Sequence, residues 1–101
     1  MKTTVHDNAA DSRFEITVDG ELAGFVDYRK DGNEYALPHT RVYPQFEGRG
    51  IGRTLINGAL EEISSRGGTV LPYCPFIPPV IRDNPEFVAL VPEDERATFE
   101  L

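Results

Sequence analysis

Three glycines at alternate positions, Gly48, Gly50 and Gly52, lie between a β-like run and a helical pattern. Glycine tolerates φ > 0 and lets another group approach the backbone closely. A glycine-rich turn that opens a helix also leaves backbone N–H groups unpaired, with the positive end of the helix dipole behind them. This arrangement predicts an anion site, whose commonest occupant is a phosphate. A plain flexible turn before a helix is the alternative.

The glycine spacing excludes two common phosphate loops. The dinucleotide fingerprint G-x-G-x-x-G does not fit, because the spacing here is G-x-G-x-G, and no Gly-Lys-Ser/Thr follows as a Walker loop requires. Three side chains in or near the loop could contact phosphates, namely Gln45, Arg49 and Arg53. Arg49 is the best candidate of these, because it lies within the loop.

Two further residues could take part in chemistry, the single cysteine, Cys74, and one of two histidines, His39. A thiol beside a histidine can be deprotonated and become a nucleophile or an acetyl carrier. Histidine is also the side chain that most readily accepts a proton near neutral pH. The structural alternatives are a small buried apolar side chain for Cys74 and a packed strand residue for His39. No intrachain disulfide is possible, and no metal site is expected.

Length and charge bound the class of protein. A chain of 101 residues suits one compact domain. The formal net charge of −7 argues against a nucleic-acid partner and is compatible with a cationic amine substrate. No run approaches the ~20 apolar residues of a membrane span. The polar start, Met1 to Asp11, lacks the core of a signal peptide, so we expect a cytoplasmic protein without a membrane partner. No residue pattern indicates the oligomeric state, for which the working expectation is a monomer or weak homodimer.

The first half of the chain predicts an antiparallel sheet. Arg13 to Val18 alternates polar and apolar residues, and Asp19-Gly20 is a strong hairpin signal. The return strand runs from Glu21 to Arg29, and Lys30 to Asn33 makes a second turn. A third strand, Glu34 to Val42, ends at the glycine loop. The residues expected on one face of the return strand are Leu22, Gly24, Val26 and Tyr28.

The helix after the loop begins at Ile51 and ends at Gly67-Gly68. Its apolar residues form one stripe at a period of 3.6, at positions 51, 55, 56, 59, 60 and 63. Thr69 to Tyr73 then predicts a short buried strand. A strand that returns after a helix crossover pairs in parallel with the strand before it.

Each strand of this parallel pair carries a proline, Pro38 in one and Pro72 in the other. Proline cannot donate to a ladder, so the two strands should pair poorly there and splay apart. A gap between adjacent strands is a natural slot for an extended ligand, which can use their free backbone groups. We expect His39, near the middle of the third strand, and Cys74, just past the end of the strand after the helix, to face one another across this gap.

The last quarter of the chain predicts less regular structure. A short helix is expected from about Pro78 to Asp83, and Asn84-Pro85 stops it. A second helical turn or a strand covers Glu86 to Val91. The acidic tail, Pro92 to Leu101, is expected to be loosely ordered.

The segment Gln45-x-x-Gly48-x-Gly50 resembles the pyrophosphate-binding motif Q/R-x-x-G-x-G/A of the GNAT N-acetyltransferase superfamily. The order of elements is similar as well. More narrowly, the chain resembles the minimal single-domain, YjdJ-type branch, over about residues 12 to 91. The matching pieces include Arg13-Phe14, Gly20, Ala23-Gly24, Tyr28, Leu37-Pro38-His39-Thr40, Glu47 to Gly52, Cys74-Pro75-Phe76 and Asn84-Pro85-Glu86-Phe87.

The resemblance implies a small α/β domain of the α+β kind over 1–101, with a mainly antiparallel sheet and one splayed parallel pair. It implies acetyl-CoA as cofactor and acetyl transfer to an amine, with Cys74 and His39 as catalytic residues. The implied contacts to coenzyme A run along the third strand and across the loop, at Thr40, Arg41, Val42, Gln45, Glu47, Gly48, Arg49, Gly50, Ile51, Gly52 and Arg53.

Three positions depart from the branch. Arg41 replaces a usual glutamate, and Asn84 and Phe87 stand where histidine and tyrosine are frequent. A candidate base and a candidate tyrosine acid are therefore missing. The alternatives to an enzyme are a non-catalytic coenzyme A-binding or sensing module and a small interaction protein that kept only the scaffold.

Overall fold

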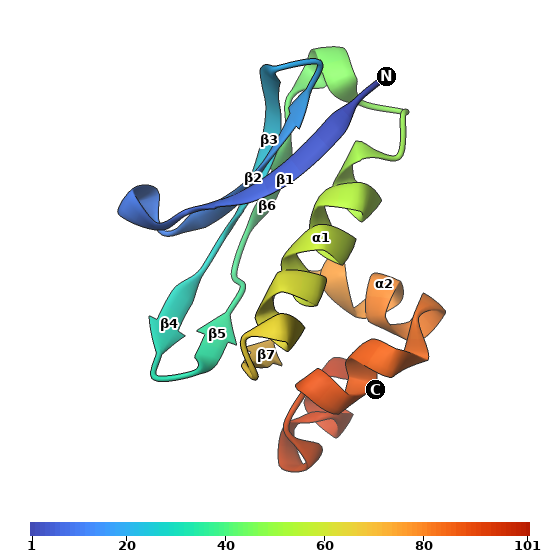
Figure 1. Ribbon diagram of the computed structural model, residues 1–101. Helices are drawn as coiled ribbons and strands as arrows, with labels where there is room; N and C mark the ends of the chain where they lie inside the picture. Colours follow the sequence, from blue (N-terminus) through green and yellow to red (C-terminus); the bar gives the residue numbers. More distant parts are fainter.

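The computed structural model describes all residues, 1–101, and arranges the strands in two sheets beside one long helix (Figure 1). The first sheet has the order β1-β2-β3-β6, and the second has the order β4-β5-β7. Every neighbouring pair is antiparallel except β5 with β7, which is parallel. The predicted fold class is confirmed. The strands are β1 Thr3–Asn8, β2 Arg13–Val18, β3 Glu21–Asp27, β4 Arg29–Asp31, β5 Glu34–Ala36, β6 Thr40–Val42 and β7 Thr69–Leu71.

The hairpin of β2 and β3 turns at Asp19-Gly20, as predicted, with both residues at positive φ. Opposite Ile16 and Thr17 the register of β3 skips Ala23, which forms a bulge. Ala23 is therefore fully buried, in place of the predicted Leu22. A Cβ at Gly24 would lie 2.4 Å from the carbonyl oxygen of Arg41, so a glycine here lets β6 approach β3 closely.

Strand β1 was not expected, because the first eleven residues read only as a polar start. It pairs antiparallel with β2 over its whole length. Its one large apolar side chain, Val5, packs against the core. One apolar residue among polar ones does not form the alternating pattern that predicts a strand. Backbone hydrogen bonds to the edge of β2 stabilise β1 instead.

The predicted third strand is split in two by Leu37-Pro38-His39. Before the break in the sequence, β5 pairs with both β4 and β7. Leu37 still donates its N–H to Leu71 and accepts one from Cys74. After the break, β6 pairs only with β3, because β7 has ended before Pro72. The two proline-bearing segments diverge there, as the prolines predicted.

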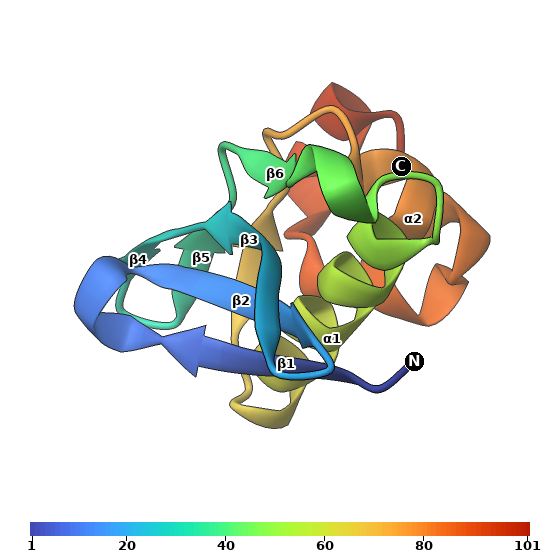
Figure 2. The ribbon, with the colours of Figure 1, turned by 90° about the horizontal axis from the view of Figure 1, so that it is seen from above.

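Helix α1, Ile51–Ser65, buries the predicted stripe of Ile51, Leu55, Ile56, Ala59, Leu60 and Ile63. The chain turns away from the helix at Gly67, which has φ 70°, and the N–H of Gly68 donates to the carbonyl of Ile63 in the last turn. In the view of Figure 2 the strands lie on one side of α1 and α2 on the other. No helix is long and apolar enough to cross a membrane.

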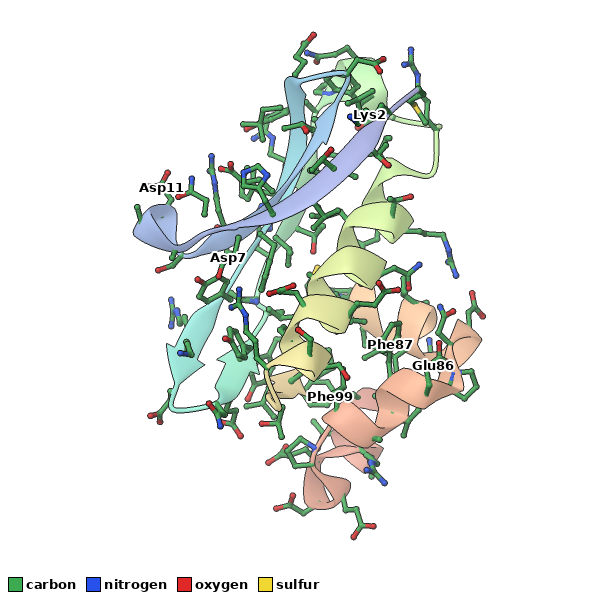
Figure 3. All side chains as sticks on the ribbon, viewed as in Figure 1. Lys2, Asp7, Asp11, Glu86, Phe87 and Phe99 are labelled. Carbon is green, nitrogen blue, oxygen red and sulfur yellow. The ribbon has the colours of Figure 1, made fainter.

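Helix α2, Ile77–Asp83, begins one residue before its predicted start, and a 3₁₀ helix follows over Pro85–Leu90. The prediction of a loose tail is wrong. Two further 3₁₀ turns cover Glu93–Glu95 and Ala97–Phe99 (Figure 3). Phe99 is 8% exposed, and its ring lies edge-on to Tyr73 at 5.4 Å. Phe99 therefore anchors the tail to the rest of the protein. The sequence does not predict this contact, because Phe99 lies in an acidic segment and the surface that it packs against forms only in the folded protein.

A polar network links the two sheets through side chains of β1, β5 and the residue that follows α1. Tyr28 donates a hydrogen bond to Asp7 of β1, at 2.9 Å. Arg66, just after α1, forms an ion pair with Asp7 and donates to the hydroxyl of Tyr35 in β5. Burial and the hydrogen bond to Asp7 raise the pKa of Tyr28 to about 12. The protonated phenol of Tyr28 is therefore part of what holds the sheets together.

Candidate functional site

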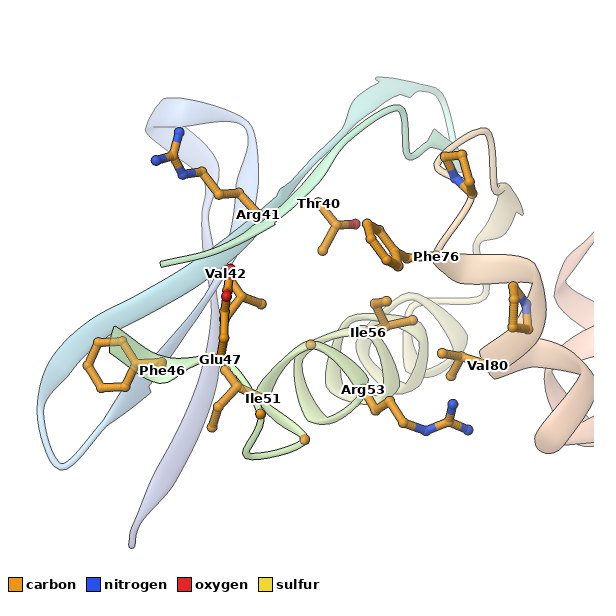
Figure 4. Close-up of a pocket in the computed structure, with 15 residues that line it drawn as sticks. Thr40, Arg41, Val42, Phe46, Glu47, Ile51, Arg53, Ile56, Phe76 and Val80 are labelled. Carbon is orange, nitrogen blue, oxygen red and sulfur yellow. The ribbon is translucent and has the colours of Figure 1, made fainter. Parts of the chain in front are cut away.

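A pocket of about 570 Å³ opens where β6 and β7 diverge (Figure 4). One wall is β6, a second is the glycine loop with the first turns of α1, and a third is the segment from Pro75 to Val80. The pocket thus lies in the gap that the two prolines predicted. Nine of the eleven residues expected to contact coenzyme A line it: Thr40, Arg41, Val42, Glu47, Gly48, Gly50, Ile51, Gly52 and Arg53.

The wall formed by β6 offers unpaired backbone groups. His39 accepts a hydrogen bond from the N–H of Asp27, and Tyr43 donates its N–H to Ala23. The backbone N–H and C=O groups of the odd-numbered residues, 39, 41 and 43, therefore point towards β3. Because hydrogen bonding alternates along an antiparallel strand, the N–H and C=O of Thr40 and Val42 face the opposite, open edge. An extended ligand with amide groups could bind there as an added strand.

The glycine loop has the backbone shape that an anion site needs. Gly48 and Gly50 have φ values of 80° and 71°, and Gly50 is the N-cap of α1. No side chain caps the helix. The first N–H groups of an α-helix have no partner within the helix, so those of Ile51, Gly52 and Arg53 are available. The buried ring of Phe46 anchors the start of the loop.

The positive charges near the pocket have different surroundings. Arg53 is paired with Asp83 at 2.5 Å, which ties α1 to α2. The guanidinium of Arg41 lies 5.3 Å from the centre of the Tyr43 ring. Arg49 is exposed and, like Gln45, does not line the pocket. The side chain of Arg49 makes no hydrogen bond or ion pair within the protein, so it is free to turn towards a phosphate held by its neighbours Gly48 and Gly50, which do line the pocket.

The structure does not bring His39 and Cys74 together, and the predicted pairing is wrong in its geometry. Thr40 faces inward, so its neighbour His39 faces outward; His39 is exposed and lies edge-on to Phe25 at 6.3 Å. Cys74 is 3% exposed and belongs to the hydrophobic core. The prediction placed His39 near the middle of a strand that runs to Val42, but the parallel pair ends at Ala36 and Leu71, before either residue. Neither residue lines the pocket.

Sequence reasoning missed the wall opposite β6. Its members are Pro75, Phe76, Pro79 and Val80, with Ile56 of α1 between the walls and Phe46 beside the loop. Phe76 is 69% exposed and is one of three large apolar side chains that are exposed in the protein. A proline-rich run after a strand could have indicated an irregular wall, but not that α2 folds back against α1.

The family model described as GCN5-related N-acetyl-transferase matches residues 13–91. This span is most of the chain and contains both β6 and the glycine loop. The chain therefore belongs to the GCN5-related N-acetyltransferase family, whose acetyl donor is acetyl-coenzyme A. The predicted recognition is confirmed at the level of this superfamily.

Solved structures agree with this assignment. A GCN5-like protein from Staphylococcus aureus is 19% identical, over 88% of this chain and 87% of that one, with a TM-score of 0.64. The ribosomal-protein-S18-alanine N-acetyltransferase from Escherichia coli is 27% identical, over 57% of this chain and 38% of that one, with a TM-score of 0.54. The chain thus spans well under half of the E. coli protein. The S. aureus likeness shows the fold alone.

Proposed function

We propose that this protein is an acetyl-CoA-dependent N-acetyltransferase. The observation that carries the proposal is one pocket with two kinds of unpaired backbone groups. At one end are the N–H groups of an uncapped helix N-terminus, beside glycines at positive φ. Along the side is the open edge of β6. A coenzyme with a pyrophosphate at one end and an amide-bearing arm matches both.

Each part of the pocket then has a task. The loop from Gly48 to Gly52 holds the pyrophosphate, and Thr40 and Val42 hold the arm by their backbone groups. Acetyl-CoA supplies the acetyl group as a thioester. The nitrogen of the acceptor amine forms a bond to the acetyl carbon, the carbon–sulfur bond breaks, and the released thiol takes up the proton that the amine loses.

The acceptor is an amine. The net charge of −7 attracts a cationic amine and repels the phosphates of a nucleic acid, so a nucleic acid is not expected as a partner. A cytoplasmic location and a monomeric or weakly dimeric state remain predictions from the sequence. So do the catalytic roles of Cys74 and His39.

A second function is favoured by one observation. Neither Cys74 nor His39 lines the pocket, so the proposed coenzyme A site lacks the expected catalytic pair among its lining residues. A coenzyme A-binding or sensing module without turnover would have this arrangement.

Thermal melting with coenzyme A tests the shared part of both functions. At a hundredfold excess over Kd, binding stabilises the folded state by about 2.7 kcal/mol. For a domain of this size we expect the melting temperature to rise by about 10–20 °C. An unchanged midpoint at millimolar coenzyme A would exclude both functions.

Gly50→Val and Gly32→Val form a matched pair for the same measurement. Both glycines have positive φ, and a Cβ at either would meet nothing within 4 Å. Each substitution should therefore cost a similar ~1–2 kcal/mol in the ligand-free protein. Only Gly50 lines the pocket, so Gly50→Val should lose the coenzyme A shift and Gly32→Val should keep it. Normal binding by Gly50→Val would mean that the loop is only a turn.

Release of the coenzyme A thiol separates the enzyme from the binding module. The purified protein is incubated with acetyl-CoA and a panel of amines and lysine peptides, and the free thiol is followed by a colorimetric reagent. Amine-dependent release that Gly50→Val abolishes supports the transferase. Tight binding without release for any amine in the panel supports the module.

A further inference from the structure

The hydroxyl oxygen of Thr40 is the one buried side-chain nitrogen or oxygen atom that has no hydrogen-bond partner. Thr40 is 9% exposed, and its register partner on β3 is the apolar Val26. A buried hydroxyl without a partner destabilises a protein, and valine would have the same shape without that cost. An unsatisfied group of this kind needs an explanation, and a ligand is one.

The position of Thr40 in the pocket indicates which part of a ligand lies near it. Figure 4 shows the hydroxyl oxygen pointing towards Phe76, at the end of the pocket that also holds Ile56 and Val80. Glu47 and Ile51, next to the glycine loop, are at the other end. Thr40 is thus far from the expected pyrophosphate and close to where the reactive end of the ligand would lie.

The labelled side chains that lie nearest the hydroxyl, Phe76 and Ile56, are both apolar and cannot accept its hydrogen bond (Figure 4). The ring of Phe76 is 69% exposed and therefore only loosely held by the core. It is the neighbour that a ligand can displace at least cost. Once the ring moves, the hydroxyl gains a partner without any change in β6.

We propose that the hydroxyl of Thr40 donates a hydrogen bond to the acetyl carbonyl oxygen of bound acetyl-CoA. This rests on the proposed use of acetyl-CoA and adds a side-chain contact to the reacting group. The hydrogen bond orients the carbonyl and draws electron density towards its oxygen, which makes the acetyl carbon more open to attack by an amine. The contact exists only while the acetyl group is present.

The test compares Thr40→Val and Thr40→Ser by calorimetric titration with acetyl-CoA and with coenzyme A. Thr40→Val should weaken acetyl-CoA about fivefold, the effect of a hydrogen bond worth ~1 kcal/mol. Its affinity for coenzyme A should stay within about twofold, since the thiol has no carbonyl. Thr40→Ser should restore the preference for acetyl-CoA. Thr17→Val, the same change in the same sheet outside the pocket, should alter neither affinity.

Two further readouts do not depend on affinity. Without ligand, Thr40→Val should melt at the same temperature as the wild type or higher, because an unsatisfied hydroxyl has been removed. The infrared carbonyl band of bound acetyl-CoA, labelled with ¹³C at the carbonyl, should lie at higher frequency in Thr40→Val than in the wild type.

Each other outcome overturns the proposal in a recognisable way. Equal weakening of both ligands would place the contact on the arm of the coenzyme rather than on the acetyl group. Unchanged affinities would mean that the hydroxyl contacts no ligand. A clear fall in the ligand-free melting temperature of Thr40→Val would make the hydroxyl a structural group. If the wild type binds neither ligand, the proposed function itself fails, and the contact with it.

Discussion

The two halves of the segment from Glu34 to Val42 have opposite surroundings, although the sequence predicts them as one strand. The first half, β5, has a hydrogen-bonded strand on each side. The second half, β6, has a strand on one side and the pocket on the other. Pro38 lies between them, without an N–H to continue a ladder.

Within these nine residues, the first half contributes to the stability of the fold and the second half is available to bind a ligand. In the first half, backbone groups pair with each other and Tyr35 is almost fully buried. In the second half, the free groups of Thr40 and Val42 remain for a ligand. We therefore expect substitutions around β5 and β7 to act on unfolding, and those around β6 and the loop to act on coenzyme binding.

Two valine-to-alanine substitutions, one in the strand beside β5 and one in β6 itself, should give the largest contrast in stability. Val70 in β7 is fully buried, so Val70→Ala should cost about 2–3 kcal/mol through lost burial and a cavity. Val42 is only partly buried, and Val42→Ala should cost about 1 kcal/mol or less. Urea unfolding measures both. Equal losses would contradict the division between the halves.

Arg49→Ala should sharpen the assignment of the open half. A charge-assisted contact to phosphate is worth roughly 1.5–3 kcal/mol. The substitution should therefore weaken coenzyme A about tenfold or more, while pantetheine, which has no phosphate, keeps its affinity. Calorimetry with both ligands measures this, and equal losses would show that Arg49 has a structural role.

Tyr28→Phe tests the network that joins the two sheets, through its dependence on pH. The pKa of Tyr28 is raised to about 12 in the folded protein, above the ~10 of an unfolded tyrosine. The folded state therefore holds this proton more tightly. Its stabilisation is complete below pH ~10 and is lost as the pH rises towards ~12.

The stability difference between wild type and Tyr28→Phe should shrink by about 1 kcal/mol from pH 9 to pH 11. Tyr73→Phe is the matched control, because Tyr73 is 55% exposed and donates no hydrogen bond to a carboxylate. Parallel pH profiles for the wild type and Tyr28→Phe would mean that the hydrogen bond to Asp7 contributes nothing.

The smallest effects are expected from His39→Ala and Cys74→Ala on coenzyme A binding. Because neither residue lines the pocket, affinity should stay within about twofold, and His39→Ala should change stability by about 0.5 kcal/mol or less. Turnover then decides their roles. If Cys74 carries acetyl, Cys74→Ala ends turnover and mass spectrometry finds acetyl on the wild-type thiol. If the amine attacks directly, Cys74→Ala stays active.

The features that the sequence determined by itself are local ones. The Asp19-Gly20 hairpin and the stripe of α1 follow from residues near one another in the chain, and so does the Gly48–Gly50 turn. The parallel pair followed from the strand–helix–strand order, and its divergence from Pro38 and Pro72. The resemblance of the loop to a known motif then identified nine residues that do line one pocket.

Tertiary structure decided which face each remaining residue took. His39 turned outward because β6 pairs with β3 and Thr40 faces the core, whereas Cys74 was drawn into that core after β7 had ended. Strand β1, the anchor Phe99 and the wall of Phe76 and Val80 each depend on surfaces contributed by distant segments. Packing against segments that are distant in the sequence contributes free energy that no local sequence pattern records. The same packing buries the hydroxyl of Thr40 in the pocket without a hydrogen-bond partner.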